Sequence, residues 1–560
     1  SRSVVADSMT RADSKDNAKP NGQQPTPGSA PRDKNPTMSY GLHAVCVILA
    51  IALSGGAYGY FQADLTSEDW WAQAVVGRGD VTTVSILEWE PKLMEEAMRN
   101  NTPVVFANTP ASDWAAMQKW TLGYLANSLN DLDIVQVSSN PNRSTYTYDV
   151  KNTPLEPILQ KENYDSGYTG QSMKARDFFL GLINQSDDRW LYYSGSLAQS
   201  DGKKPKVLLD LGDPNEFELK QAAEATGRGR ADVEELLYVW MGKPGVKAHG
   251  HYDHVHGLFV QITGYKRWLL FPPSVHEILA PYPFLHPRRG QTRLDLESPV
   301  FEGSSSVSPE DMQKIRDSMM YVVLEPGDVL YVPPLWMHHV TCYDSAMGPP
   351  ISVSIWRRAA SDLATESLTK IPIPVSDKWP SYLRWSGAYS FAYHVLSFFN
   401  EDGTDSPCAG RMRRGEAPGL DEQCVKTAAV LFSRTRERYR SVAPWGAQET
   451  PAPEDGTYEF RCRVQKGEGY VVVGPKPNGY EDFLTFEVEN LRETRDKALQ
   501  VADILKPLTP EERLIVAFDF IESTMIAAVG INGLYDALAA FPANCPPKNL
   551  TKTHAIPPSA

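Results

Sequence analysis

Residues 249–263 read HGHYDHVHGLFVQIT, and this stretch sets the expectation for both the fold and the chemistry of the chain. From Leu258 to Ile262 every second residue is aliphatic, which is the period of a β-strand whose two faces meet different surroundings. His251 and Asp253 are two residues apart, so in extended backbone their side chains point to the same side. The stretch therefore predicts a strand-rich core with two metal-ligating side chains close together.

Strand signals dominate from Glu234 to Trp356. A turn at Gly264 separates the first strand from a second one, Lys266 to Phe271. Further along, Tyr321 to Leu324 and Val329 to Val332 flank a Pro-Gly turn and are predicted to form a second hairpin. Many short strands separated by turns predict a double-sheet barrel or jelly roll.

The regions on either side of this core have a different character. Before it, strand and helix patterns are mixed, with a helix expected at Ala175 to Ile183. After it, helical patterns prevail, and Thr509 is the expected N-cap of a helix that opens at Pro510. We therefore expect a mixed α/β fold, with a double-stranded β-helix core, N-terminal α/β elements and a mainly helical C-terminal part over 361–560.

A metal site needs a third ligand in addition to His251 and Asp253. His338 and His339 follow a predicted strand and offer candidates. Two imidazoles and one carboxylate on one face, with open positions left, form the site of non-haem iron oxygenases. Taken alone, a His-x-Asp pair is a weak signal, and a structural or surface pair is the alternative.

Several motifs in order along the chain resemble the JmjC oxygenases, which depend on Fe(II) and 2-oxoglutarate and have a cupin-like jelly-roll core. Within that family, the motifs look most similar to the asparaginyl hydroxylase that acts on hypoxia-inducible factor. The resemblance covers residues 85–360 and does not extend into 361–560. It rests on Thr102–Val105, Trp114, Trp120, Tyr124–Leu125, Gly250–Asp253, Gln261–Arg267, Leu270–Pro273, Pro326–Pro333, Trp336–His339 and Ile351–Trp356.

The resemblance implies a role for six residues. His251, Asp253 and His338 would be the iron ligands, because the matched motif uses the first histidine of the His338–His339 pair. Lys266 would bind the distal carboxylate of 2-oxoglutarate; independently, an inward lysine on a barrel strand requires an anion. Tyr192 would donate its hydroxyl to the same carboxylate and Trp356 would line the pocket. For Lys266 the alternative is a surface position, and for the two aromatic residues it is core packing.

Three positions depart from the pattern of the similar proteins. Ala248 replaces a threonine that contacts the cosubstrate, Gly257 replaces an asparagine, and Ser354 occupies another polar position. These changes predict thinner cosubstrate contacts, with weaker affinity or an altered pocket. The additional histidines at 249, 254 and 256 receive no role.

The N-terminal part contains an apolar run. Residues 1–37 have almost no large apolar side chains and are expected to be disordered. Residues 41–61 are apolar and long enough to cross a membrane as a helix, with a buried core helix as the alternative. Basic residues before the run and acidic residues after it predict that 38–63 is a signal-anchor or signal peptide. The catalytic part would then lie in the lumen of the endoplasmic reticulum or Golgi.

Cysteines, sequons and charge bear on the compartment and on the partners. Cys408, Cys424, Cys462 and Cys545 could form two disulfides, or remain unpaired, and four Asn-x-Ser/Thr sequons follow the apolar run. The net charge of -14 and the pI of about 5.4 argue against broad capture of nucleic acid.

The expected function is that of a protein or peptide hydroxylase that couples oxidative decarboxylation of 2-oxoglutarate to hydroxylation of its substrate. The alternatives are a non-catalytic JmjC-like binding or scaffold protein, a demethylase, and a cupin-type metalloenzyme that does not use 2-oxoglutarate. The role of residues 361–560 stays open between forming a homodimer, capping the barrel and holding substrate.

Overall fold

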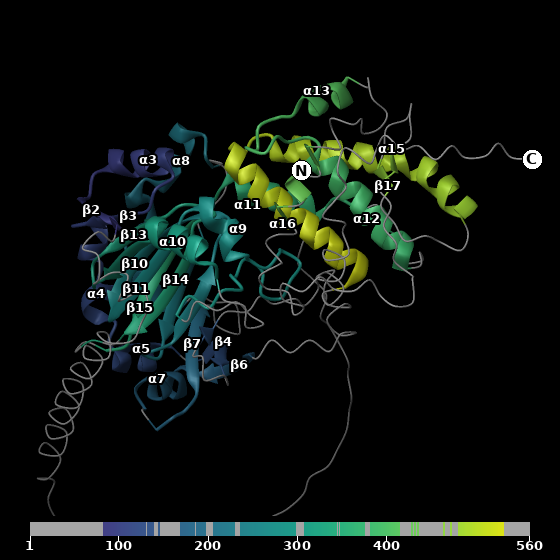
Figure 1. The fold of residues 1–560 in the computed structure, drawn as a ribbon. Helices are drawn as coiled ribbons and strands as arrows, with labels where there is room; N and C mark the ends of the chain where they lie inside the picture. The colour runs from purple at the N-terminus through teal and green to yellow at the C-terminus, as the bar shows by residue number, and fades with distance from the viewer. Residues whose placement is uncertain are drawn as a thin grey trace, which may run out of the picture. The chain divides into compact units, whose positions relative to one another are not determined.

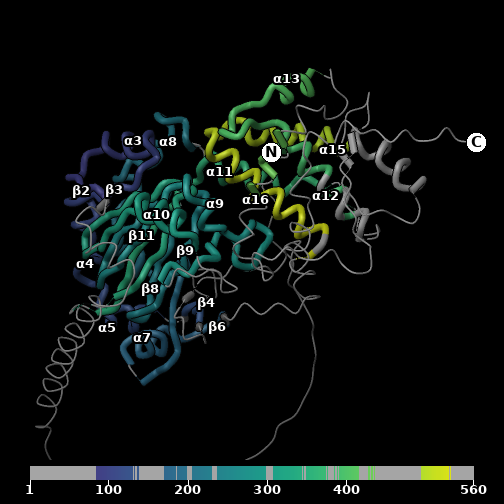
Figure 2. Tube along the Cα trace, in the orientation of Figure 1, coloured from purple at the N-terminus to yellow at the C-terminus, as the bar shows by residue number. Residues whose placement is uncertain are grey.

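A computed structural model gives the fold of the chain (Figure 1). Residues whose placement is not described are grey in Figure 2. The structure describes residues 82–129, 131–138, 144–145, 168–184, 186–197, 205–229, 236–297, 307–343, 345, 348–373, 375, 381–414, 427–428, 430–432, 434–435, 463–464, 471–472 and 480–530.

Two sheets form the centre of the fold, as the alternating sequence predicted. In the described residues the smaller sheet has the strand order β1-β12-β11-β14-β9-β5 and the larger one β2-β3-β13-β10-β15-β8-β7-β4-β6. The smaller sheet consists of β1 (Thr82–Thr83), β12 (Met320–Leu324), β11 (Tyr265–Phe271), β14 (Met337–Tyr343), β9 (Lys247–His251) and β5 (Ser144–Thr145). The larger consists of β2 (Ser85–Glu88), β3 (Val104–Ala107), β13 (Val329–Val332), β10 (Val255–Thr263), β15 (Ile351–Arg358), β8 (Leu236–Gly242), β7 (Trp190–Gly195), β4 (Asp131–Ser138) and β6 (Tyr168–Lys174).

One hydrophobic cluster joins the inner faces of the two sheets. Phe259 and Leu330 come from the larger sheet, and Trp268 and Val322 come from the smaller one. All four side chains are buried. Two sheets packed face to face over a shared apolar core confirm the jelly-roll expectation.

The predicted second hairpin is wrong. β12 pairs with β11 in the smaller sheet, whereas β13 pairs with β10 in the larger one. The connecting turn crosses from one sheet to the other, with Gly327 at a φ of 101° and its N–H donating to the carbonyl of Gln261 at 2.9 Å. A hairpin and a corner between sheets share the same local pattern of strand, Pro-Gly turn and strand, so local signals do not distinguish them.

Short helices flank the sheets. The predicted helix at 175–183 is present as α7 (Ala175–Ile183). The other helices in the described part before residue 360 are α3 (Pro91–Asn100), α4 (Ala116–Lys119), α5 (Leu122–Ser128), α8 (Leu219–Thr226), α9 (His276–Leu279) and α10 (Pro309–Ser318).

The described residues of the C-terminal part are mainly helical, as predicted. Its described helices are α11 (Ala360–Thr369), α12 (Ser381–Leu396), α13 (Pro407–Arg413), α15 (Tyr480–Leu505) and α16 (Pro510–Val529). Thr509 caps α16 in a capping box with Glu512. Side chains from α11, α12, α15 and α16 share one hydrophobic cluster with Phe271 and Leu335 of the barrel. The helices and the barrel therefore share a core.

The predicted tail at 1–37 and the predicted apolar span at 41–61 lie outside the described residues. Within the part of the chain that is described, none of the helices combines the length and the apolar character that crossing a membrane requires.

Candidate metal centre

Two strands of the smaller sheet carry the histidines of the predicted metal site. His251 ends β9, His338 lies near the start of β14, and the two are direct cross-strand partners with ring centroids 4.2 Å apart. Asp253 follows β9, and its Oδ2 lies 3.7 Å from Nε2 of His338. One ligand atom from each of the three residues lies within 4.8 Å of the others. A single ion can bridge atoms at this spacing.

A bulge in β9 aims the first ligand. His251 pairs with His338 and Ala248 pairs with Val340, so three steps along β9 match two steps along β14. Regular alternation would place Ala248 and His251 on opposite faces. Because the bulge takes up the extra residue, both line the same pocket.

A backbone carbonyl orients each histidine ring. The carbonyl of His249 lies 2.7 Å from Nδ1 of His251, and the carbonyl of Trp336 lies 3.0 Å from Nδ1 of His338. Since a carbonyl only accepts, each ring donates from Nδ1, and in the neutral ring Nε2 keeps its lone pair. Both histidines are thereby prepared to bind a metal through Nε2.

Burial controls the charge at the site. It lowers the pKa of His338 well below the ordinary value, and the neighbouring His251 adds to this effect. It also raises the pKa of Asp253, against the opposing influence of His251 and Arg289. Neutral imidazoles are the metal-binding form of histidine. A bound divalent cation would place positive charge beside the carboxylate of Asp253 and so stabilise its ionised form.

His339 lies on the other face of β14 from His338. Its side chain is buried, and its Nε2 lies 3.4 Å from a carboxylate oxygen of Glu297. Its ring stands edge-on to that of His249 at 6.2 Å. Alternation along the strand thus separates the two histidines of the pair, and the structure brings only His338 to the metal site.

Lys266 lies in the same small pocket as the three ligands. It is 2% exposed, and its Nζ donates to Oγ of Ser352 at 2.5 Å. No salt bridge joins it to a carboxylate in the part of the chain that is described, and burial lowers its pKa to about 8. A buried ammonium with a single hydroxyl partner has two donors left for an anion.

Tyr192 and Trp356 also line this pocket. Tyr192 is buried, and the absence of a side chain at Gly242 makes room for its ring, since a Cβ there would come within 2.7 Å of it. Nε1 of Trp356 is buried, and among the described residues it has no hydrogen-bond acceptor. All six predicted site residues therefore surround one cavity.

Ser352 and Trp240 are among the lining residues that were not predicted. They are opposite each other in the register between β15 and β8, and Nε1 of Trp240 donates to Oγ of Ser354 at 2.7 Å. Ser352 lies two residues before Ser354 and four before Trp356, so strand alternation could have placed it on the pocket face. Trp240 could be assigned only once the pairing of β8 was known.

The departure at Gly257 has a steric cause. A Cβ at this position would come within 2.8 Å of the ring of Phe259, which itself lines the pocket. Phe259 in turn packs against Trp268 at 4.7 Å, and Trp268 lies 5.5 Å from the ring of His338. An aromatic wall here takes the place of a polar side chain.

The additional histidines have other partners. His256 is fully buried between the hydroxyl of Tyr331, at 2.9 Å, and the carbonyl of Arg228, at 3.1 Å. Nε2 of His249 lies 2.9 Å from the carbonyl oxygen of Thr292. His254 is displaced from the ligand cluster and lines a larger groove beside it.

The two faces of β14 give a matched test of metal binding. We expect His338→Ala to weaken binding of Co(II), followed by absorbance titration, by about 100-fold or more, because loss of a direct ligand costs more than loss of a supporting residue. His339→Ala should bind the metal like the wild type. Equal loss in both variants, with both folded by circular dichroism, would contradict the assignment.

Comparison with known proteins places this geometry in a family. Residues 90–362 match the family model described as a cupin-like domain. The chain is 27% identical to "Jumonji C domain-containing protein 5" of Drosophila melanogaster, over 49% of this chain and 57% of that protein. It is 28% identical to "HSPB1-associated protein 1" of Bos taurus, over 54% of this chain and 58% of that protein. It is 23% identical to "Bifunctional peptidase and (3S)-lysyl hydroxylase JMJD7" of Homo sapiens, over 48% of this chain and 83% of that protein.

The chain therefore spans a little more than half the length of the first two of these relatives. The matched region contains both sheets' principal strands and all six residues of the pocket described above. The region that holds the barrel and its His-Asp-His cluster thus matches the cupin-like domain family, and the relatives to which it is similar include Jumonji C proteins.

Proposed function

We propose that this chain is an Fe(II)- and 2-oxoglutarate-dependent oxygenase that hydroxylates a protein or peptide. The observation that carries the proposal is that the His251–Asp253–His338 cluster and the buried Lys266 line one cavity. A three-ligand metal site beside a buried cation without a carboxylate partner suits a cosubstrate that binds a metal at one end and a lysine at the other.

The donor set fits iron. Two imidazole nitrogens and one carboxylate oxygen suit Fe(II) and leave coordination positions open. Lys266 and Ser352 would hold the distal carboxylate of 2-oxoglutarate, with the buried N–H of Trp356 and the hydroxyl of Tyr192 near it. When bound, the iron and cosubstrate supply the chemistry that couples oxidative decarboxylation to hydroxylation.

The chain's own residues supply orientation and exclusion of water. Backbone carbonyls fix the rings of His251 and His338. Phe259 and Trp268 pack as one wall of the cavity, which limits the access of solvent. Lys266 holds positive charge against the anion in an apolar environment, where the attraction is stronger than in water.

Turnover tests the proposal against a binding protein that has lost activity. The full chain with Fe(II), ascorbate and 2-oxoglutarate is expected to release succinate, and Asp253→Ala should reduce the release to background because it removes one of three ligands. His339→Ala is the matched control and should remain active. A wild-type chain that binds metal and 2-oxoglutarate but releases no more succinate than Asp253→Ala would support the scaffold alternative.

The pKa of Lys266 predicts how cosubstrate binding depends on pH. Lys266 is protonated below about pH 8, and binding of the carboxylate requires that proton. Affinity for 2-oxoglutarate, measured by calorimetry, should therefore be highest below about pH 8 and fall by up to about tenfold per pH unit above it. Burial raises the pKa of the nearby Cys342 thiol, which keeps that group neutral near pH 8.

Lys266→Gln should bind weakly and lose most of this pH dependence, because glutamine keeps a donor but carries no titrating charge. A wild-type affinity that stays constant from about pH 7 to about pH 9.5 would contradict a charged Lys266 at the site.

We further propose that the cupin-like domain lies in the lumen of the secretory pathway. The apolar run at 41–61, with basic residues before it and acidic residues after it, supports this placement. Cys408 is disulfide-bonded, and disulfides persist in oxidising compartments.

N-glycosylation tests the compartment. Asn184 is exposed at the end of α7, and its Oδ1 accepts hydrogen bonds from the backbone N–H and hydroxyl of Ser186, at 3.0 and 2.7 Å. We expect glycopeptide mapping of the full chain from eukaryotic cells to find a glycan at Asn184, absent in Asn184→Gln and kept in Ser186→Thr. A chain unmodified at both Asn184 and the exposed Asn100 would count against lumenal placement.

A further inference from the structure

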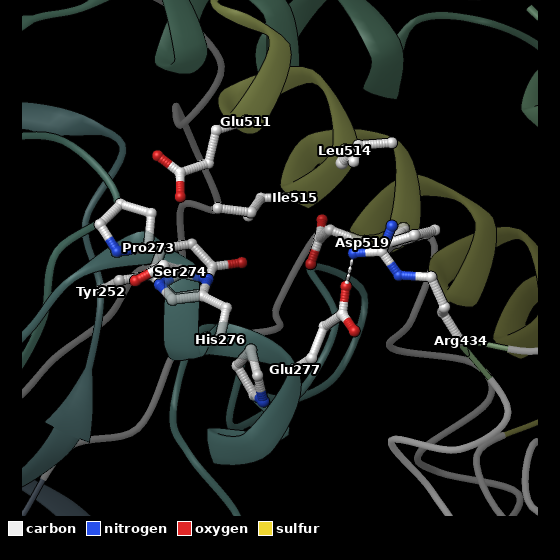
Figure 3. A pocket seen from close by; sticks show the side chains of 12 residues that line it. Tyr252, Pro273, Ser274, His276, Glu277, Arg434, Glu511, Leu514, Ile515 and Asp519 are labelled. Atoms are coloured by element: carbon white, nitrogen blue, oxygen red, sulfur yellow. Dashed lines mark hydrogen bonds and ion pairs between the residues drawn. The ribbon is translucent and has the colours of Figure 1, made fainter. Parts of the chain in front are cut away.

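The reverse face of the metal centre packs against the C-terminal helices. Tyr252 lies between two ligands in the sequence and Met337 precedes the third, and both side chains belong to the hydrophobic cluster that includes α11, α12, α15 and α16. Figure 3 shows Tyr252 and His276 lining one pocket with Leu514 and Ile515 of α16. The ligands line the metal pocket, whereas their neighbours in the chain pack towards the helices.

Leu335 has a strained backbone conformation beside this contact. Its φ is 65°, in the left-handed region that a residue with a Cβ adopts only where its surroundings stabilise it. Its side chain is 0% exposed and belongs to the same hydrophobic cluster as the C-terminal helices. Burial of this aliphatic side chain therefore stabilises a conformation that is otherwise disfavoured.

The backbone of Leu335 connects this cluster to the metal ligands. Its N–H donates to the carbonyl of Asp253 at 2.7 Å, and its own carbonyl accepts from Nε2 of His276 at 2.6 Å. The next carbonyl in the chain, that of Trp336, accepts from Nδ1 of His338 at 3.0 Å. A rotation of Leu335 out of the left-handed region would withdraw its N–H from Asp253 and turn the carbonyl that orients His338.

We infer that Leu335 is a positioning residue for the metal centre, kept in its left-handed conformation by packing among the C-terminal helices. His276 stabilises the same conformation by donating to the carbonyl of Leu335. The inference rests on the function proposed above, of which it needs only the metal site. It gives the C-terminal helices a role in metal affinity, because they keep Asp253 and His338 in a geometry that an ion can enter without rearrangement.

Two substitutions at Leu335 separate backbone positioning from core packing. Leu335→Ala and Leu335→Gly both remove the side chain from the core and should destabilise the chain. Alanine keeps the Cβ that disfavours a positive φ, whereas glycine adopts such a φ freely. We therefore expect Leu335→Ala to bind Co(II) about tenfold more weakly than the wild type in absorbance titrations of the full chain, and Leu335→Gly to stay within about threefold of the wild type.

Two further variants test the packing and the hydrogen bond separately. Leu505 lies on α15, is 0% exposed and belongs to the same cluster, but it is not next to a metal ligand in the chain. Leu505→Ala should lower the thermal unfolding midpoint as Leu335→Ala does and leave the Co(II) affinity unchanged. His276→Phe keeps an aromatic ring but removes the donor to Leu335, and it should weaken Co(II) binding about threefold to tenfold.

Hydrogen exchange of the metal-free chain gives a second readout that needs no ion. The amide of residue 335 is protected by its hydrogen bond to the carbonyl of Asp253. By mass spectrometry, the peptide that contains this amide should exchange faster in Leu335→Ala than in the wild type. It should remain protected in Leu335→Gly and in Leu505→Ala.

Equal Co(II) affinity of the alanine and glycine variants of Leu335, or tighter binding by the alanine variant, would overturn the inference, since loss of packing alone does not favour glycine. An equal loss of affinity in Leu505→Ala would overturn it as well. A wild-type chain that binds no Co(II) removes the metal site and the inference together. If the affinities follow the expected order but no succinate is released, the positioning role stands and only the oxygenase function fails.

Discussion

The pairing of β9 with β14 is the constraint on which the site depends. It makes His251 and His338 cross-strand partners although 86 residues separate them in the sequence. The bulge in β9 keeps Ala248 and His251 on the same pocket face. Hydrogen bonds to the carbonyls of His249 and Trp336 then fix which ring nitrogen faces the metal. Rigid backbone pairing thus positions the ligands before any ion binds.

The same arrangement divides the chemistry between the two sheets. The smaller sheet provides both histidines and Lys266, and the larger sheet provides Tyr192, Ser352 and Trp356. Closing the sheets over an aromatic core brings these groups together in an environment where charge is costly. Burial consequently shifts the pKa values of His338, Asp253 and Lys266, each in the direction that disfavours the charged form. A metal ion and an anion would each relieve part of that cost.

The C-terminal helices bear directly on this centre because they share the barrel's hydrophobic core. Tyr252 points into that core from between two metal ligands. α11 and α16 also border the groove that leads to Asp253. The shared core and the lining of the groove fit the predicted role of capping the barrel, and a homodimer stays a prediction.

The sequence by itself determined the strand-rich core, the helix at 175–183, the N-cap at Thr509 and the residues that could bind a metal, because alternation, capping and ligand chemistry are local properties. Only the tertiary structure decided that β12 and β13 belong to different sheets, that Trp240 joins the pocket, and that α16 reaches the groove. Those outcomes depend on strand register and on packing between segments far apart in sequence, and neither leaves a trace in a local residue pattern.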